Sequence, residues 1–78
     1  MPTLLIIFEM RFFFYSDEHE PIHVHVYCNG KRVKIALVPN VEVVYNHGLK
    51  EQEINNAVEI CQLYREEFIE EWLKRFDS

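Results

Sequence analysis

The fold is decided around residues 17–26, which read DEHEPIHVHV. Pro21 biases the residue before it toward an extended conformation, so the chain is expected to enter a β-strand at this point. His23 and His25 lie two apart, and in a strand their imidazoles leave one face while the valines at 24 and 26 leave the other. The stretch therefore predicts a strand with one polar face and one apolar face that enters a core.

The segment that follows predicts a hairpin. Asn29-Gly30 is the dipeptide that most strongly indicates a two-residue turn between antiparallel strands. Residues 31–37 then alternate apolar side chains with mostly basic ones. If the apolar residues share the core face with the two valines, Arg32 and Lys34 share the outer face with the two histidines. We therefore expect both imidazoles to face outward, beside basic side chains.

Further strands are predicted on both sides of this hairpin, and a helix after it. Residues 3–8 and 11–15 are β-branched and aromatic runs joined by a tight turn at Glu9-Met10. Residues 41–45 give another strand, and residues 51–76 contain no Gly or Pro and carry a helical apolar stripe. The prediction is an α+β fold, with a small, mostly antiparallel sheet of four to five strands packed on one long C-terminal helix.

The predicted helix is long for such a sheet. It would span roughly 39 Å, whereas strands of this length span only about 17 Å. Ile60 and Leu63 lie off the main apolar stripe, and Trp72, Leu73 and Phe76 follow near the end of the helix. These side chains either contact a partner subunit or wrap around the edge of the sheet.

Length and charge limit the classes of function. The whole chain, residues 1–78, is expected to form a single domain. The net charge of -5 repels phosphate backbones, so contact with nucleic acid is expected to be weak or indirect. A small basic patch can still form in the N-terminal part from Arg11, Lys31, Arg32 and Lys34.

The two cysteines and the N-terminus indicate a cytoplasmic protein. Cys28 and Cys61 are too few and too far apart for a disulfide framework or a zinc knuckle, so we expect reduced thiols that pack in the core. The apolar run at residues 4–8 is too short for a signal peptide or a membrane span. We therefore expect a protein that is neither exported nor inserted in a membrane.

Several motifs together resemble the small bacterial domain-of-unknown-function family 4160. They are Met1-Pro2-Thr3, Phe13-Phe14-Tyr15, the loop and strand with His19, Pro21, His23 and His25, Asn46-x-Gly48-Leu49, and a final helix with Glu66-Glu67 and Trp72. The resemblance implies a member of a toxin-antitoxin-like gene pair, with a partner protein from the domain-of-unknown-function family 2442. Lys50 stands where the family usually has a small polar helix cap.

A metal site is one function that the histidines allow. Two histidines at positions i and i+2 of a strand have Cα atoms about 6.6 Å apart, so both can reach one ion. His19 or Asp17 from the preceding loop could supply a third ligand. Three protein ligands and a water are the usual arrangement of catalytic zinc. We expect no cofactor, and zinc or a similar divalent metal is the one alternative that this pattern admits.

Metal-free cleavage of RNA is a second hypothesis. One imidazole would act as general base and the other as general acid, while a basic side chain such as Arg32 would stabilise the phosphorane charge. For a ribonuclease or a metal-dependent hydrolase, the candidate catalytic residues are His19, His23, His25, Tyr15, Arg11 and Lys34. The acidic net charge argues against strong RNA binding.

An interaction module without chemistry is the third hypothesis, and it is the one that we favour because it asks least of the sequence. Aromatic and imidazole side chains bury well at interfaces while still forming hydrogen bonds. The partner would be a protein encoded nearby or a second copy of the chain. The candidate binding residues are Tyr15, His23, His25, Trp72 and Phe76.

Overall fold

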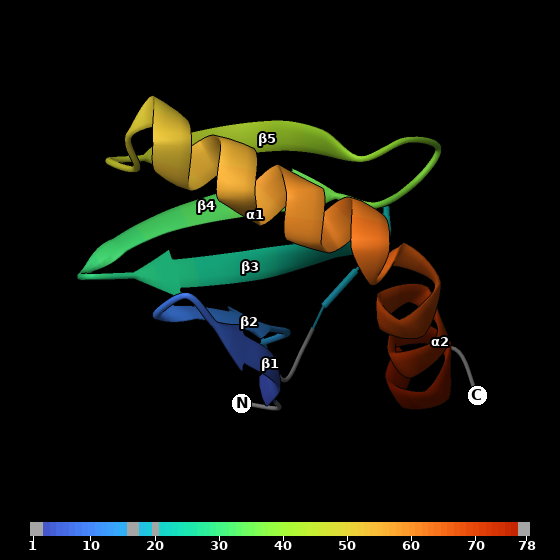
Figure 1. The fold of residues 1–78 in the computed structure, drawn as a ribbon. Helices are drawn as coiled ribbons and strands as arrows, with labels where there is room; N and C mark the ends of the chain where they lie inside the picture. The colour runs from blue at the N-terminus through green and yellow to red at the C-terminus, as the bar shows by residue number, and fades with distance from the viewer. Residues whose placement is uncertain (1–2, 16–17, 20, 77–78) are drawn as a thin grey trace.

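The computed structural model describes residues 3–15, 18–19 and 21–76. Five antiparallel strands form one sheet in the order in which they occur in the chain, and two helices follow (Figure 1). The elements are β1 (Thr3–Ile7), β2 (Met10–Phe13), β3 (His23–Cys28), β4 (Lys31–Ala36), β5 (Glu42–His47), α1 (Glu51–Leu63) and α2 (Arg65–Phe76). The predicted α+β class and antiparallel sheet are confirmed.

The central hairpin is the one that the sequence predicts. Asn29 and Gly30 adopt φ values of 52° and 78°, as a tight turn between β3 and β4 requires. The register places His25 opposite Lys34 and Val24 opposite Ile35. The valine face of β3 is therefore the core face, and the histidines leave the other face together with Lys34.

The first hairpin turns one residue earlier than predicted. Phe8 and Glu9 are the two turn residues, with φ values of 53° and 62°. Met10 is thereby the first residue of β2 and is buried in the core. The register with β1 pairs Met10 with Ile7. The turn is displaced by one residue because burying the Met10 side chain contributes a favourable free energy that an exposed turn position would not provide.

The core lies between one face of the sheet and α1. Its members from β3, β4 and α1 are Val24, Val26, Cys28, Val33, Ile35, Ala57, Ile60 and Cys61. Ile60, proposed above as a partner contact, is thus a core residue, while Leu63 is exposed. Both thiols are buried, as expected, and burial raises the pKa of the Cys61 thiol to about 12.

The prediction of one long helix is wrong, because the helix breaks at Tyr64. This residue has φ −106° and ψ 16°, which ends α1, and Arg65 begins α2. The Arg65 side chain donates from Nε to the carbonyl of Leu37 at 2.7 Å and from Nη2 to the carbonyl of Pro39 at 3.3 Å. These bonds attach the start of α2 to the segment that follows β4. No Gly or Pro in residues 51–76 indicates a helix break at this point.

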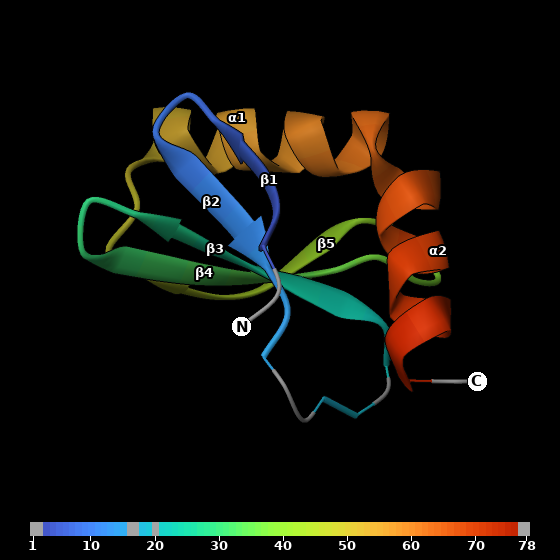
Figure 2. The same cartoon turned by 90° about the horizontal axis from the view of Figure 1, so that it is seen from below.

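The break lets α2 wrap around the end of the sheet toward the segment that joins β2 to β3 (Figure 2). Trp72 and Phe76 pack against Phe14, with ring centroids 5.4 and 5.7 Å apart. Trp72 is 1% exposed. Of the two alternatives for these aromatic residues, the structure therefore shows wrapping around the sheet, and Trp72 is not on the surface of the monomer.

Helix α1 begins at Glu51, as predicted, without a small polar cap. The backbone N–H of Lys50 donates to Oε1 of Glu53 at 2.8 Å. Just before it, Asn46 accepts from the N–H of Leu49 and donates to the carbonyl of Leu49, both at 2.9 Å. Side chains on either side of Lys50 thus replace the cap. Across the described ranges, no helix is long and apolar enough to span a membrane.

Candidate metal centre

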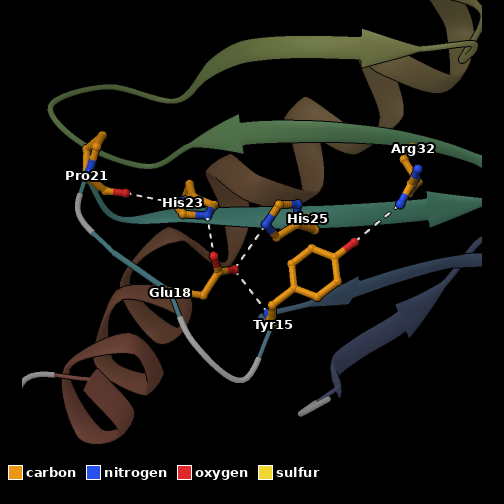
Figure 3. A network of polar contacts seen from close by, with 6 residues as sticks. All are labelled: Tyr15, Glu18, Pro21, His23, His25 and Arg32. Atoms are coloured by element: carbon orange, nitrogen blue, oxygen red, sulfur yellow. Dashed lines mark hydrogen bonds and ion pairs between the residues drawn. The ribbon is translucent and has the colours of Figure 1, made fainter.

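One loop carboxylate meets both strand histidines. Glu18 lies in the segment between β2 and β3, and Figure 3 shows its side chain between His23 and His25. Its Oε1 is 3.1 Å from Nε2 of His23, and its Oε2 is 3.0 Å from Nε2 of His25. One ligand atom from each of the three residues lies within 4.8 Å of the others, a spacing at which all three can coordinate one ion.

The cluster is buried, which corrects the expectation that the imidazoles face outward at the surface. His23 is 3% exposed and His25 is 7% exposed. The Tyr15 ring packs edge-on against His25 with centroids 4.5 Å apart, and Trp72 covers His23 at 5.1 Å. The histidines do lie opposite the core valines, but aromatic side chains from α2 and the end of β2 form a second layer over them.

The tautomer of His23 follows from its two contacts. Its Nδ1 is 2.8 Å from the carbonyl oxygen of Pro21. A carbonyl can only accept, so Nδ1 carries a proton and donates it. In the neutral ring, Nε2 then presents a lone pair to Oε1 of Glu18, which is also an acceptor. A proton or a metal ion must stand between the two atoms for this contact to be attractive.

Nε2 of His25 also faces a carboxylate oxygen of Glu18. This buried Nε2 has no hydrogen-bond partner within the described part of the chain. Oε2 of Glu18 is 3.0 Å away, but the two groups lack the alignment of a hydrogen bond. Burial lowers the pKa of His25 below its usual value, and the charges of His23 and Lys34 act in the same direction, while Glu18 opposes them. The neutral ring is therefore favoured, and its Nε2 points at the carboxylate.

Tyr15 holds the carboxylate in place. Its backbone N–H donates to Oε2 of Glu18 at 3.0 Å. Its hydroxyl, at the other end of the side chain, accepts from Nη1 of Arg32 at 3.5 Å (Figure 3). Tyr15 thus connects the buried cluster to the basic residues on the open face of the sheet.

The spacing of the three residues suits a tetrahedral ion. Zinc lies about 2.0–2.1 Å from imidazole nitrogen and carboxylate oxygen, which separates two ligands of a tetrahedral site by about 3.3 Å. The two nitrogen–oxygen distances of 3.1 and 3.0 Å, one to each oxygen of the Glu18 carboxylate, are each close to this value. The bond from His23 to Pro21 is also the outer contact that usually orients a metal-binding histidine.

The structure separates the candidates that the sequence grouped together. His19 is exposed, and among the described residues the cluster holds Glu18 in its place. Asp17, the other predicted third ligand, lies outside the described residues. Lys34 stands opposite His25, and Arg11 stands on β2, opposite Tyr27.

Sequence reasoning missed Glu18. A carboxylate five residues before the first strand histidine was the available indication, since the residues between them can reverse the chain. Residues 17–20 contain three acidic side chains and a histidine, however, and the spacing alone cannot say which of them turns inward. The choice depends on the bond from Tyr15 to the carboxylate and on the rings that cover the site.

Comparison with known proteins gives one match. The family model described as "Domain of unknown function (DUF4160)" matches residues 10–73, which include β2 through most of α2 and the whole cluster. No curated protein and no solved structure gives a significant match to the chain.

Proposed function

The chain belongs to the DUF4160 family, and we propose that it is a metal-binding domain in which Glu18, His23 and His25 hold one zinc-class divalent ion. The observation that carries this proposal is the convergence of two imidazole Nε2 atoms on one buried carboxylate. Buried polar groups are almost always satisfied, and here a cation would satisfy all three at once.

The number and type of the metal ligands favour a catalytic ion, which would promote hydrolysis, over a purely structural ion. Structural zinc sites usually have four protein ligands, whereas catalytic sites have three and leave a position for water. Two histidines and one glutamate are the three ligands of a known class of zinc hydrolase. The ion would activate that water, and Tyr15 would orient Glu18 through its backbone N–H.

The metal-free cleavage scheme has less support. It needs one imidazole to take a proton from the substrate and the other to give one to the leaving group. His23 commits Nδ1 to the Pro21 carbonyl, and both Nε2 atoms face Glu18. With both rings covered by aromatic side chains, neither nitrogen is presented to a substrate.

Zinc titration of the tag-free, metal-stripped protein tests the proposal. We expect one zinc per chain in the wild type and at least about a tenfold loss of affinity in Glu18→Gln, because even loss of an outer-shell partner typically costs 10–100-fold. The amide oxygen that replaces the carboxylate in this variant can still accept from the backbone N–H of Tyr15, so the loop keeps this contact. Isothermal titration calorimetry gives the stoichiometry and the affinity of each protein.

Two histidine variants serve as matched controls. His19→Ala removes an exposed histidine next to the ligand, and His47→Ala removes an exposed histidine on β5. Both are expected to bind zinc like the wild type. Equal affinity in Glu18→Gln and the wild type, or loss of binding in His47→Ala, would rule out this cluster as the site.

A second candidate function is partner binding, and β5 is the observation that favours it. This strand forms one edge of the sheet, and all six of its residues are exposed. Val43, Val44 and Tyr45 are large apolar side chains on it, and Val44 is 53% exposed. An exposed apolar edge strand is a template for pairing with another chain. The partner would be the nearby-encoded protein of a toxin-antitoxin-type pair in a bacterial cytoplasm.

Co-expression tests this second function. We expect the product of the adjacent gene to co-purify with the wild type and to be lost from Val44→Lys, because a charge on an edge strand blocks strand addition. Leu63→Lys, at an exposed apolar position of α1, is the control and is expected to retain the partner. Retention of the partner by Val44→Lys would place the interface elsewhere.

A further inference from the structure

The open face of the sheet carries a row of three side chains made by the strand register. Arg11 on β2 pairs with Tyr27 on β3, and Tyr27 pairs with Arg32 on β4. Residues directly opposite one another on adjacent strands leave the same face. Adjacent strands lie about 4.8 Å apart, so the two arginines flank Tyr27 at about 10 Å between their Cα atoms.

A pocket lies over this row. It has a volume of about 340 Å³ and is lined by Arg11, Phe13, Tyr15, Tyr27, Gly30 and Arg32. The lining combines two guanidinium groups with three aromatic rings, and among the described residues it contains no carboxylate. Tyr27 is 44% exposed, so its ring is open to a ligand. Such a lining suits a ligand with an anionic group and a flat ring.

Neither arginine is neutralised by the described part of the chain. Within residues 3–15, 18–19 and 21–76, no carboxylate forms an ion pair with Arg11 or Arg32. The guanidinium carbon of Arg11 lies 4.6 Å from the centroid of the Phe13 ring, and its buried Nε has no hydrogen-bond partner. Arg32 makes one long contact of 3.5 Å with the Tyr15 hydroxyl. In a chain of net charge -5, two such arginines in one pocket indicate a site for an oxyanion.

We propose that this pocket binds a nucleotide, with the phosphate between Arg11 and Arg32 and the base stacked on Tyr27. Arginine binds phosphate through paired N–H donors. Any of the bases can stack on an aromatic side chain, because each has an aromatic face. The pocket binds a single nucleotide unit, and two arginines are enough to balance the charge of one phosphate group. The protein therefore does not need a positive net charge to bind it. The unit comes either from a free nucleotide or from single-stranded RNA.

The inference goes beyond the metal centre and does not depend on it. No pocket-lining residue is a metal ligand, and Tyr15 is the residue that connects the two sites. Nucleotide binding is therefore measured in EDTA, so that it can succeed or fail independently of zinc.

Titration calorimetry with AMP, adenosine, inorganic phosphate and a short oligoadenylate RNA tests the proposal. We expect AMP to bind more tightly than adenosine or phosphate alone. Arg32→Gln is expected to weaken AMP binding at least about tenfold, as the loss of charge-assisted hydrogen bonds to phosphate requires. Tyr27→Ala is expected to reduce AMP to the affinity of inorganic phosphate.

Lys50→Gln is the matched control, since it removes one exposed positive charge away from the pocket. Arg32 and Tyr27 are also exposed, so their variants are expected to keep the fold, which circular dichroism checks. Tighter binding of the RNA than of AMP assigns the unit to single-stranded RNA, and the reverse assigns it to a free nucleotide. The proposal is overturned if AMP binds no better than adenosine, or if Arg32→Gln has no more effect than Lys50→Gln.

Discussion

Trp72→Ala is expected to lower the free energy of unfolding by about 3–5 kcal/mol, the usual cost of deleting a large buried aromatic side chain. Trp72 is 1% exposed and contacts Phe14, Phe76 and His23. A chain of this length is stabilised by about 4–12 kcal/mol in total. The variant is therefore expected to lose a large part of its stability, as urea denaturation followed by circular dichroism would show.

Leu73→Ala is the matched control for this prediction. Leu73 is the next residue of α2, but it is 43% exposed, so the change is expected to alter stability by about 0.5 kcal/mol or less. If Trp72→Ala were as stable as Leu73→Ala, α2 would not pack against Phe14 and His23, and the helix break would have no structural role.

Zinc is expected to stabilise the fold strongly. A ligand that binds the native state alone adds about 2.7 kcal/mol at a free concentration of 100 times its Kd. For a domain of this size, each kcal/mol raises Tm by about 4–8 °C, so the expected shift is roughly 11–22 °C. The shift arises because the ligands come from a loop and a strand that zinc joins together. Thermal denaturation with and without zinc measures it.

This shift is expected to be at most about half as large in Glu18→Gln, because a tenfold weaker site adds about 1.4 kcal/mol at the same zinc concentration, and to be unchanged in His47→Ala. The first variant removes the carboxylate that both imidazoles face, and the second removes an exposed histidine that packs edge-on against Tyr45. A comparable shift in both variants would mean that zinc binds weakly at several surface positions. A shift in neither the wild type nor the variants would contradict a native-state metal site.

Local patterns were sufficient to predict the central hairpin of β3 and β4. The two-residue turn requires positive φ at both positions, which Asn29 and Gly30 tolerate. The alternation of apolar and polar side chains in β4 indicates which of them enter the core. The face that carries the histidines follows from the same alternation. These features depend on neighbours within a few residues, and such neighbours are visible in the sequence.

Features that depend on distant contacts could not be predicted. The helix breaks at Tyr64 because Arg65 bonds to the carbonyls of Leu37 and Pro39, and because Trp72 finds its place beside Phe14. Burial of the histidines has the same cause, since the covering rings come from α2 and the end of β2. Glu18 was missed because its role depends on how the loop before β3 folds back over the strand.

X-ray absorption spectroscopy of the zinc-loaded, tag-free protein is the measurement that tests the metal site most directly. The Glu18, His23 and His25 centre predicts a shell of two imidazole nitrogens and one carboxylate oxygen at about 2.0–2.1 Å, with water at the remaining position. In Glu18→Gln the carboxylate oxygen should be missing from this shell. A shell with fewer than two imidazoles, or the same shell in Glu18→Gln, would contradict the proposed centre.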